Sequence, residues 1–145
     1  MLKGTIEVTS FIKKNGDEKG RHLTHLRQLK EAQLCVLKFK ETALENENII
    51  DSTMFSVIQK LKYVEGIVIQ TENDEFYMIE ERIKGLEIFY LGKFIKFSNN
   101  ELLRNNVSTE VFDCLSHHSY FQSSETRMLV DVQGSTTTLT DPQFR

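Results

Sequence analysis

The chain has 145 residues, of which 39% are hydrophobic and 27% are charged, and its formal net charge is −3. This length fits one domain, which buries about two-thirds of its unfolded surface when the fold is complete. The negative charge argues against nucleic acid or an anionic membrane as a partner. No stretch reaches membrane-spanning length, and the amino terminus lacks the apolar region of a secretory signal, so we expect a cytoplasmic protein.

The first third of the chain contains two stretches that predict strands. Residues 5–13 alternate apolar and polar side chains, and residues 14–21 form a charged segment with two glycines. A hairpin turn is the preferred interpretation of that segment, and a phosphate-binding loop is the alternative. Residues 33–40 predict a second strand, in which Lys38 shares a face with aliphatic side chains. Such a lysine must reach water or meet an anion, and reaching water is the simpler interpretation.

The middle of the chain predicts a helix followed by a hairpin. Apolar residues recur with helical period over residues 48–62, and Asp51 or Ser52 could cap the start of that helix. Residues 64–70 and 75–83 then read as two strands joined by a polar turn.

A short helix is predicted over residues 108–118, with Ser108 as its N-cap. His117 lies off the apolar side of this helix, and a single histidine is more often a hydrogen-bonded residue than a metal ligand. The two cysteines, Cys35 and Cys114, each lie beside apolar residues, which predicts buried free thiols rather than a disulfide.

Residues 127–133 predict a strand that ends at Gly134, with Asp131 and Gln133 on the same face. Asp141 returns ten residues after Asp131, directly before the only proline of the chain. Two carboxylates and an amide offer hard oxygen ligands, which suit Mg²⁺, and one of the acids could instead accept a proton. The simplest alternative is an aspartate that starts a turn before proline.

Two segments in the last third resemble those of the alpha-kinases, a family of atypical serine/threonine protein kinases. Their core signature is similar to Asp131-Val132-Gln133-Gly134 followed, after five residues, by Thr140-Asp141-Pro142. Upstream, the family's Phe-Ser-His-aromatic-Thr-Tyr segment is similar to Leu115-Ser116-His117-His118-Ser119-Tyr120.

The resemblance implies roles for several of these residues. Asp131 would be the catalytic base that faces the substrate hydroxyl, Gln133 and Asp141 would hold Mg²⁺, and His117 would be the first ligand of a structural zinc. The strand around Lys38 is similar to the family's Val-x-Lys strand, which implies that Lys38 contacts the ATP phosphates. Lys40 would replace it if the register slips by two residues.

Glu80 and Gly85 match the spacing of a family element that meets adenine between the two lobes. The alternative is that Glu80 is simply at the solvated end of a strand. The resemblance implies an α+β, two-lobed, protein-kinase-like fold, with a β-rich N-lobe over about residues 1–85 and an incomplete C-lobe over residues 86–145. Family members continue into a glycine-rich loop and a Cys-x-x-x-Cys pair that completes the zinc site. We therefore expect a C-terminally truncated domain with little activity, and zinc only in a full-length domain.

The function implied is that of an ATP-dependent protein serine/threonine kinase that uses Mg²⁺ and acts on a protein substrate, with neither nucleic acid nor a membrane as partner. A catalytically inactive remnant that acts as a binding module is the main alternative. The third reading is an unrelated α+β binding domain.

Overall fold

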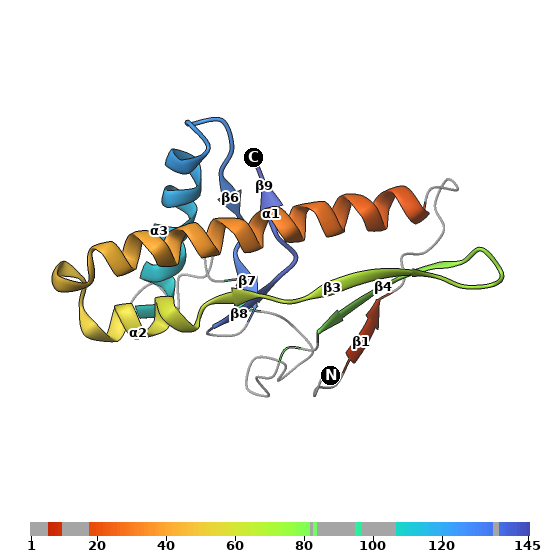
Figure 1. Cartoon of the computed structure of the whole chain (residues 1–145), viewed down its shortest axis with the longest axis horizontal. Coiled ribbons are helices and arrows are strands. Elements are labelled where there is room, and N and C mark those ends of the chain that lie inside the picture. The colour runs from red at the N-terminus through yellow and green to blue at the C-terminus, as the bar shows by residue number, and fades with distance from the viewer. Residues whose placement is uncertain (1–5, 10–17, 82, 84–94, 97–106, 135–136) are drawn as a thin grey trace.

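The computed structural model describes residues 6–9, 18–81, 83, 95–96, 107–134 and 137–145. The chain mixes helices with short strands, and the long helix α1 crosses the whole molecule (Figure 1). Among the described helices, none is both long and apolar enough to span a bilayer. In chain order the elements are β1 (Ile6–Thr9), α1 (Glu18–Glu45), the 3-10 helix η1 (Glu47–Ile49), α2 (Ser52–Lys60), β2 (Lys62–Tyr63), β3 (Gly66–Gln70), β4 (Phe76–Glu81), β5 (Ile95–Lys96), α3 (Val107–Gln122), β6 (Leu129–Val130), β7 (Gln133–Gly134), β8 (Thr138–Thr140) and β9 (Gln143–Phe144).

The strands form three sheets. The first has the order β1-β4-β3 and is antiparallel, which confirms the predicted hairpin and the part of the first predicted strand that is described. The second has the order β2-β8-β7-β5 and pairs β2 in parallel with β8, so it joins the middle of the chain to its end. The third sheet is the pair β6-β9.

The strand predicted for residues 33–40 is wrong, because these residues belong to helix α1. The buried side chains of α1 recur every three or four residues, which is a helical period. They are Leu29, Ala32, Val36, Phe39 and Ala43. Leucines are also exposed on the opposite side of the helix. Within the eight residues 33–40, these leucines and the buried residues together imitate the alternation of apolar and polar side chains in a strand. The hairpin turn predicted for residues 14–21 is also wrong from Glu18 onward, and residues 14–17 lie outside the described ranges.

Helix α1 covers one face of the β3–β4 hairpin (Figure 1). Gly66 permits the close approach: a Cβ atom there would lie 2.6 Å from Cε of Met78 and 2.9 Å from Cδ2 of Leu29. Both of those side chains are fully buried. The absent side chain at Gly66 therefore sets the distance between helix and sheet.

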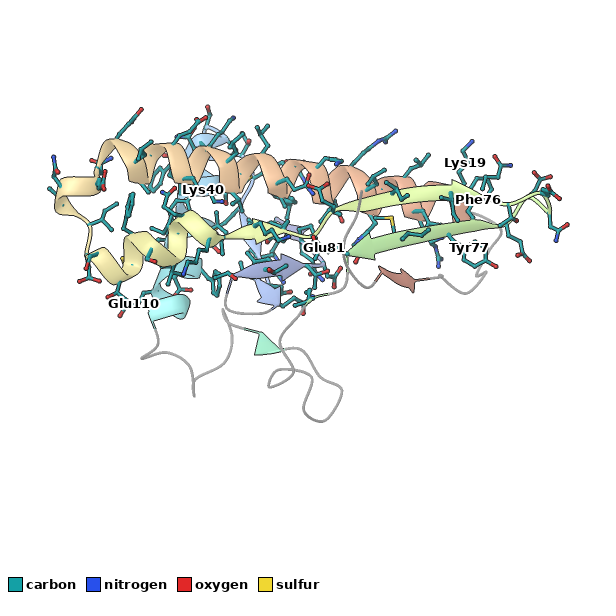
Figure 2. The ribbon with its side chains drawn as sticks, turned by 60° about the horizontal axis from the view of Figure 1, so that its bottom comes forward. Lys19, Lys40, Phe76, Tyr77, Glu81 and Glu110 are labelled. Atoms are coloured by element: carbon teal, nitrogen blue, oxygen red, sulfur yellow. The ribbon has the colours of Figure 1, made fainter. Side chains whose placement is uncertain are left out.

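Polar side chains of α1 also bind the hairpin region. His22 Nε2 lies 3.1 Å from the carbonyl oxygen of Phe76, and the Gln33 amide donates to the carbonyl oxygen of Val64 at 2.9 Å. Lys19 places its ammonium 5.7 Å from the centre of the Phe76 ring, and both residues are labelled near the end of the hairpin in Figure 2. These contacts fix the rotation of α1 about its axis.

Helix α2 begins after Asp51, whose carboxylate accepts hydrogen bonds from the backbone N–H groups of Thr53 at 3.0 Å and Met54 at 3.2 Å. The predicted helix is confirmed, with Asp51 as the cap. We expect Asp51→Ala to lower the free energy of unfolding by about 1 kcal/mol, because two N–H groups lose their acceptor. Ser52→Ala is the matched control in urea denaturation, and equal midpoints for the two variants would contradict this assignment.

Helix α3 is longer than predicted, and the predicted N-cap Ser108 is wrong because the helix already begins at Val107, but the predicted apolar side is confirmed. Val111 and Leu115 are fully buried, and the ring of His118 lies 5.3 Å from that of Phe39 on α1. Thr42 and His118 Nε2 are also joined by a 2.9 Å hydrogen bond. Burial lowers the pKa of His118, and the Lys38 cation lowers it further.

Cys35 and Cys114 are free thiols, as predicted, but the predicted burial is wrong for Cys114, which is exposed on α3. Cys35 is half-buried, and this burial raises the pKa of its thiol.

Candidate functional site

The strand predicted over residues 127–133 is divided by Asp131 into β6 and β7, which belong to different sheets. Opposite it, Asp141 separates β8 from β9 in the same way. The register of β6 with β9 and that of β7 with β8 are continuous, so Asp131 faces Pro142 and Val132 faces Asp141. Strands β6 to β9 therefore form one antiparallel ribbon that passes from one sheet into another.

Both aspartates at this break have a left-handed backbone, with φ of 49° at each. Aspartate tolerates this conformation better than most residues, because its short side chain can form local hydrogen bonds. Such backbone conformations cost free energy and occur preferentially at functional sites. Two aspartates with this conformation lie next to each other on paired segments, and we therefore take this break as the candidate site.

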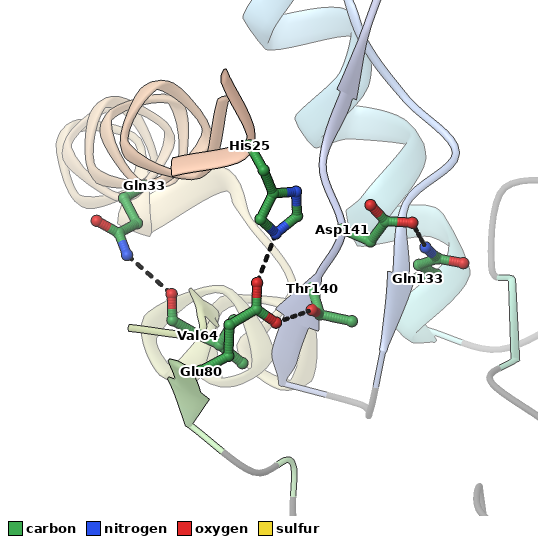
Figure 3. A network of polar contacts seen from close by, with 7 residues as sticks. All are labelled: His25, Gln33, Val64, Glu80, Gln133, Thr140 and Asp141. Atoms are coloured by element: carbon green, nitrogen blue, oxygen red, sulfur yellow. Dashed lines mark hydrogen bonds and ion pairs between the residues drawn. The ribbon is translucent and has the colours of Figure 1, made fainter. Parts of the chain in front are cut away.

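Gln133 and Asp141 meet at the break, as Figure 3 shows. The Gln133 amide nitrogen donates to Oδ2 of Asp141 at 2.8 Å. Gln133 is buried, whereas Asp141 is exposed, so the pair reaches the protein surface at the carboxylate. These two predicted ligands are thus in contact, and their role in holding an ion stays a prediction.

The pair fits the needs of Mg²⁺. Neighbouring ligands of an octahedral Mg²⁺ ion with bonds of 2.0–2.1 Å stand about 3 Å apart. The facing atoms of Gln133 and Asp141 already stand 2.8 Å apart. Turning the Gln133 amide over would place its oxygen where the nitrogen now lies, and would present two oxygens to the same point.

A second polar network lies beside this pair, as Figure 3 also shows. His25 Nε2 of α1 lies 2.5 Å from Oε1 of Glu80 on β4. The other carboxylate oxygen of Glu80 accepts from Oγ1 of Thr140 at 3.5 Å. The hydrogen bond to Glu80 raises the pKa of His25, burial opposes this rise, and the charges of Glu80 and Asp141 add to it.

The adenine contact that the resemblance implies for Glu80 stays a prediction, and the structure shows which groups surround this residue. It lies in the central strand of its sheet, opposite Glu7 on one side and Gly66 on the other. Its backbone therefore faces other strands, and its side chain faces His25. Gly85 lies outside the described residues.

The two lysines considered for the ATP phosphates do not join the cluster. Lys38 and Lys40 are both on α1, and Lys38 is exposed. Lys38 follows His25 by more than three helical turns, which places it about 20 Å further along the helix axis. Its prediction depended on a strand that the structure replaces with a helix.

His117 is exposed on α3. Within the described ranges, no three His, Cys, Asp or Glu side chains are grouped so that they could hold a metal ion. The role of His117 as a zinc ligand stays a prediction.

Ser119 is a structural residue to which the sequence reasoning gave no role. Its hydroxyl accepts from the backbone N–H of Leu129 at 2.9 Å and donates to the carbonyl oxygen of Ser116 at 2.6 Å. It thereby joins α3 to β6, two residues before Asp131. Its position in the Leu115–Tyr120 segment is the sequence feature that could have indicated this role. The contacts of Thr140 and His25 with Glu80 were also not predicted.

The comparisons with known proteins identify the family and the fold of the chain. The model of the alpha-kinase family matches residues 5–145. The chain belongs to the alpha-kinase family. A search of curated proteins gives no significant match.

Solved structures of alpha-kinase domains share the fold. The apoenzyme domain of myosin-II heavy chain kinase A is 15% identical with a TM-score of 0.59, over 94% of this chain and 48% of that one. An inactive form of the same domain complexed with ATP has a TM-score of 0.58 at 15% identity, over 94% of this chain and 49% of that one. The AMP-PNP complex is 16% identical with a TM-score of 0.58 and the same coverage.

These matches confirm the predicted α+β alpha-kinase fold. The chain spans about half the length of these solved domains. The division into lobes near residue 85 stays a prediction.

Proposed function

We propose that this chain carries the phosphoryl-transfer site of a cytoplasmic, ATP-dependent protein serine/threonine kinase. The observation that carries the proposal is the contact between Gln133 and Asp141 at a break where Asp131 also has a left-handed backbone. Family membership supports this function, and complexes of similar domains with ATP and AMP-PNP support the nucleotide.

Each of the three residues has a distinct task in this proposal. Gln133 and Asp141 would hold Mg²⁺, which when bound supplies positive charge that offsets the charge of the ATP phosphates. Asp131 orients the serine or threonine hydroxyl of the protein substrate and accepts its proton. Thr140 and Ser119 keep the ribbon in place on either side.

An inactive remnant that binds nucleotide or a partner is the second candidate. One observation favours it: Lys38 lies on α1, far from the cluster. Binding of MgATP without phosphate transfer would identify this case.

Phosphate incorporation from labelled ATP into a serine/threonine peptide, measured as Mg²⁺ is titrated, tests the proposal. We expect Asp141→Asn to raise the Mg²⁺ concentration needed for half the maximal rate by at least about tenfold, because the ion loses a charged ligand. Asp74→Asn is the matched control, since Asp74 also has positive φ but lies in the turn between β3 and β4. Incorporation that needs no Mg²⁺, or an equal response of the two variants, would refute the magnesium site.

A further inference from the structure

The pair His25 and Glu80 has no task in the mechanism above, yet it lies beside the candidate site, because Glu80 also contacts Thr140. Both side chains are largely buried, with 15% and 16% exposed. A buried carboxylate needs a partner for its charge, because removal from water is costly. His25 supplies that partner from α1, the longest element of the chain.

The pair contacts Thr140, the residue that precedes Asp141. Glu80 uses one carboxylate oxygen for His25 and the other for Thr140. Thr140 is buried at the end of β8 and lies opposite Gln133 in register. The contact thus joins the first sheet to the second at the point where the chain turns into Asp141 (Figure 3).

Electrostatics connect the same residues. The carboxylates that act on His25 are Glu80 from β4 and Asp141 from the turn between β8 and β9, and both raise its pKa. The neighbouring histidine on α1, His22, faces the carbonyl oxygen of Phe76 instead. The positive charge on His25 is therefore favoured by carboxylates from two different elements.

We propose that His25 and Glu80 are positioning residues, which hold Thr140 so that Asp141 stays within reach of Gln133. The consequence for Mg²⁺ rests on the proposed function, whereas the geometric coupling of His25 to Gln133 does not. The two parts can therefore be tested separately.

NMR titration without metal tests the geometric part. We expect the side-chain amide signals of Gln133 to shift with the same midpoint as the imidazole of His25. In Glu80→Gln the pKa of His25 should fall, because the largest cause of its rise is removed while burial still lowers it. The proposal would be overturned if the chemical shifts of the Gln133 amide changed neither with the titration of His25 nor in the Glu80→Gln variant.

The pH dependence of stability gives a second readout. Since the pKa of His25 is raised on folding, its contribution to the free energy of unfolding is complete below the ordinary pKa of about 6.5 and is lost as the pH rises through the raised value. His25→Gln keeps a donor for Glu80 and should flatten this dependence. His117→Gln, on the exposed side of α3, should not flatten it. If the free energy of unfolding depended on pH equally in these two variants, the proposed ion pair between His25 and Glu80 would be contradicted.

The magnesium requirement of phosphate transfer tests the consequence for the site. We expect His25→Ala to raise the Mg²⁺ concentration for half the maximal rate several-fold, and His25→Gln to restore most of it. An unchanged requirement in His25→Ala would refute the positioning role. If the unmodified protein transfers no phosphate, the proposed function fails while the Gln133 titration still decides the coupling.

Discussion

Replacing Gly134 by alanine should lower the free energy of unfolding by about 3–5 kcal/mol. A Cβ atom at this position would lie 2.3 Å from the carbonyl oxygen of Thr138 and 2.8 Å from Cα of Leu139. Gly134 also has a φ of 144°, which side-chain-bearing residues rarely adopt. Because the obstructing atoms are the backbone of β8, relief would require breaking the β7–β8 pairing. Urea denaturation followed by circular dichroism measures the loss.

Gly66→Ala is the matched control for this substitution. Its Cβ atom would come too close only to the flexible ends of Met78 and Leu29, with Cγ of Glu80 at an ordinary contact distance of 3.6 Å, so overpacking should cost about 1–3 kcal/mol. A loss in Gly134→Ala no larger than that in Gly66→Ala would show that β7 and β8 do not approach as closely as described. Loss of the β7–β8 pairing should also separate Gln133 from Asp141.

The hairpin and the capped helix were predictable from the sequence because their signals are local. The β3–β4 hairpin alternates apolar side chains around a polar turn, and Asp51 precedes a short helical pattern. Helix α1 was not predictable in this way, because leucines lie on both its buried and its exposed sides. Missing α1 also removed any means of predicting the pair His25 and Glu80, whose members are 55 residues apart in the chain.

The candidate site was predicted in part. The motif indicated that Gln133 and Asp141 belong to one site, and in the structure a hydrogen bond joins them. The arrangement of Asp131 differs from the prediction, because a left-handed residue divides the expected strand. Aspartate permits this conformation without requiring it, so only the pairing of β6 with β9 and of β7 with β8 determines it.

Asp131→Asn should reduce phosphate transfer by about 10²–10⁴-fold, which is the usual contribution of a general base. Asparagine tolerates positive φ as aspartate does, so the break between β6 and β7 should persist. The amide has almost the same size but cannot accept the proton of the substrate hydroxyl. The loss should therefore appear in the maximal rate, with the Mg²⁺ requirement nearly unchanged, in the same labelled-ATP assay.

Comparison with Asp141→Asn separates the two aspartates, because each has the same φ and the same substitution. If Asp131 serves as the base and Asp141 holds the ion, the first variant loses rate at every Mg²⁺ concentration, while the second recovers rate as Mg²⁺ is raised. Thermal unfolding of both variants checks that the ribbon stays folded. Recovery of Asp131→Asn at high Mg²⁺ would assign that carboxylate to the ion instead, and full activity would exclude it from the reaction.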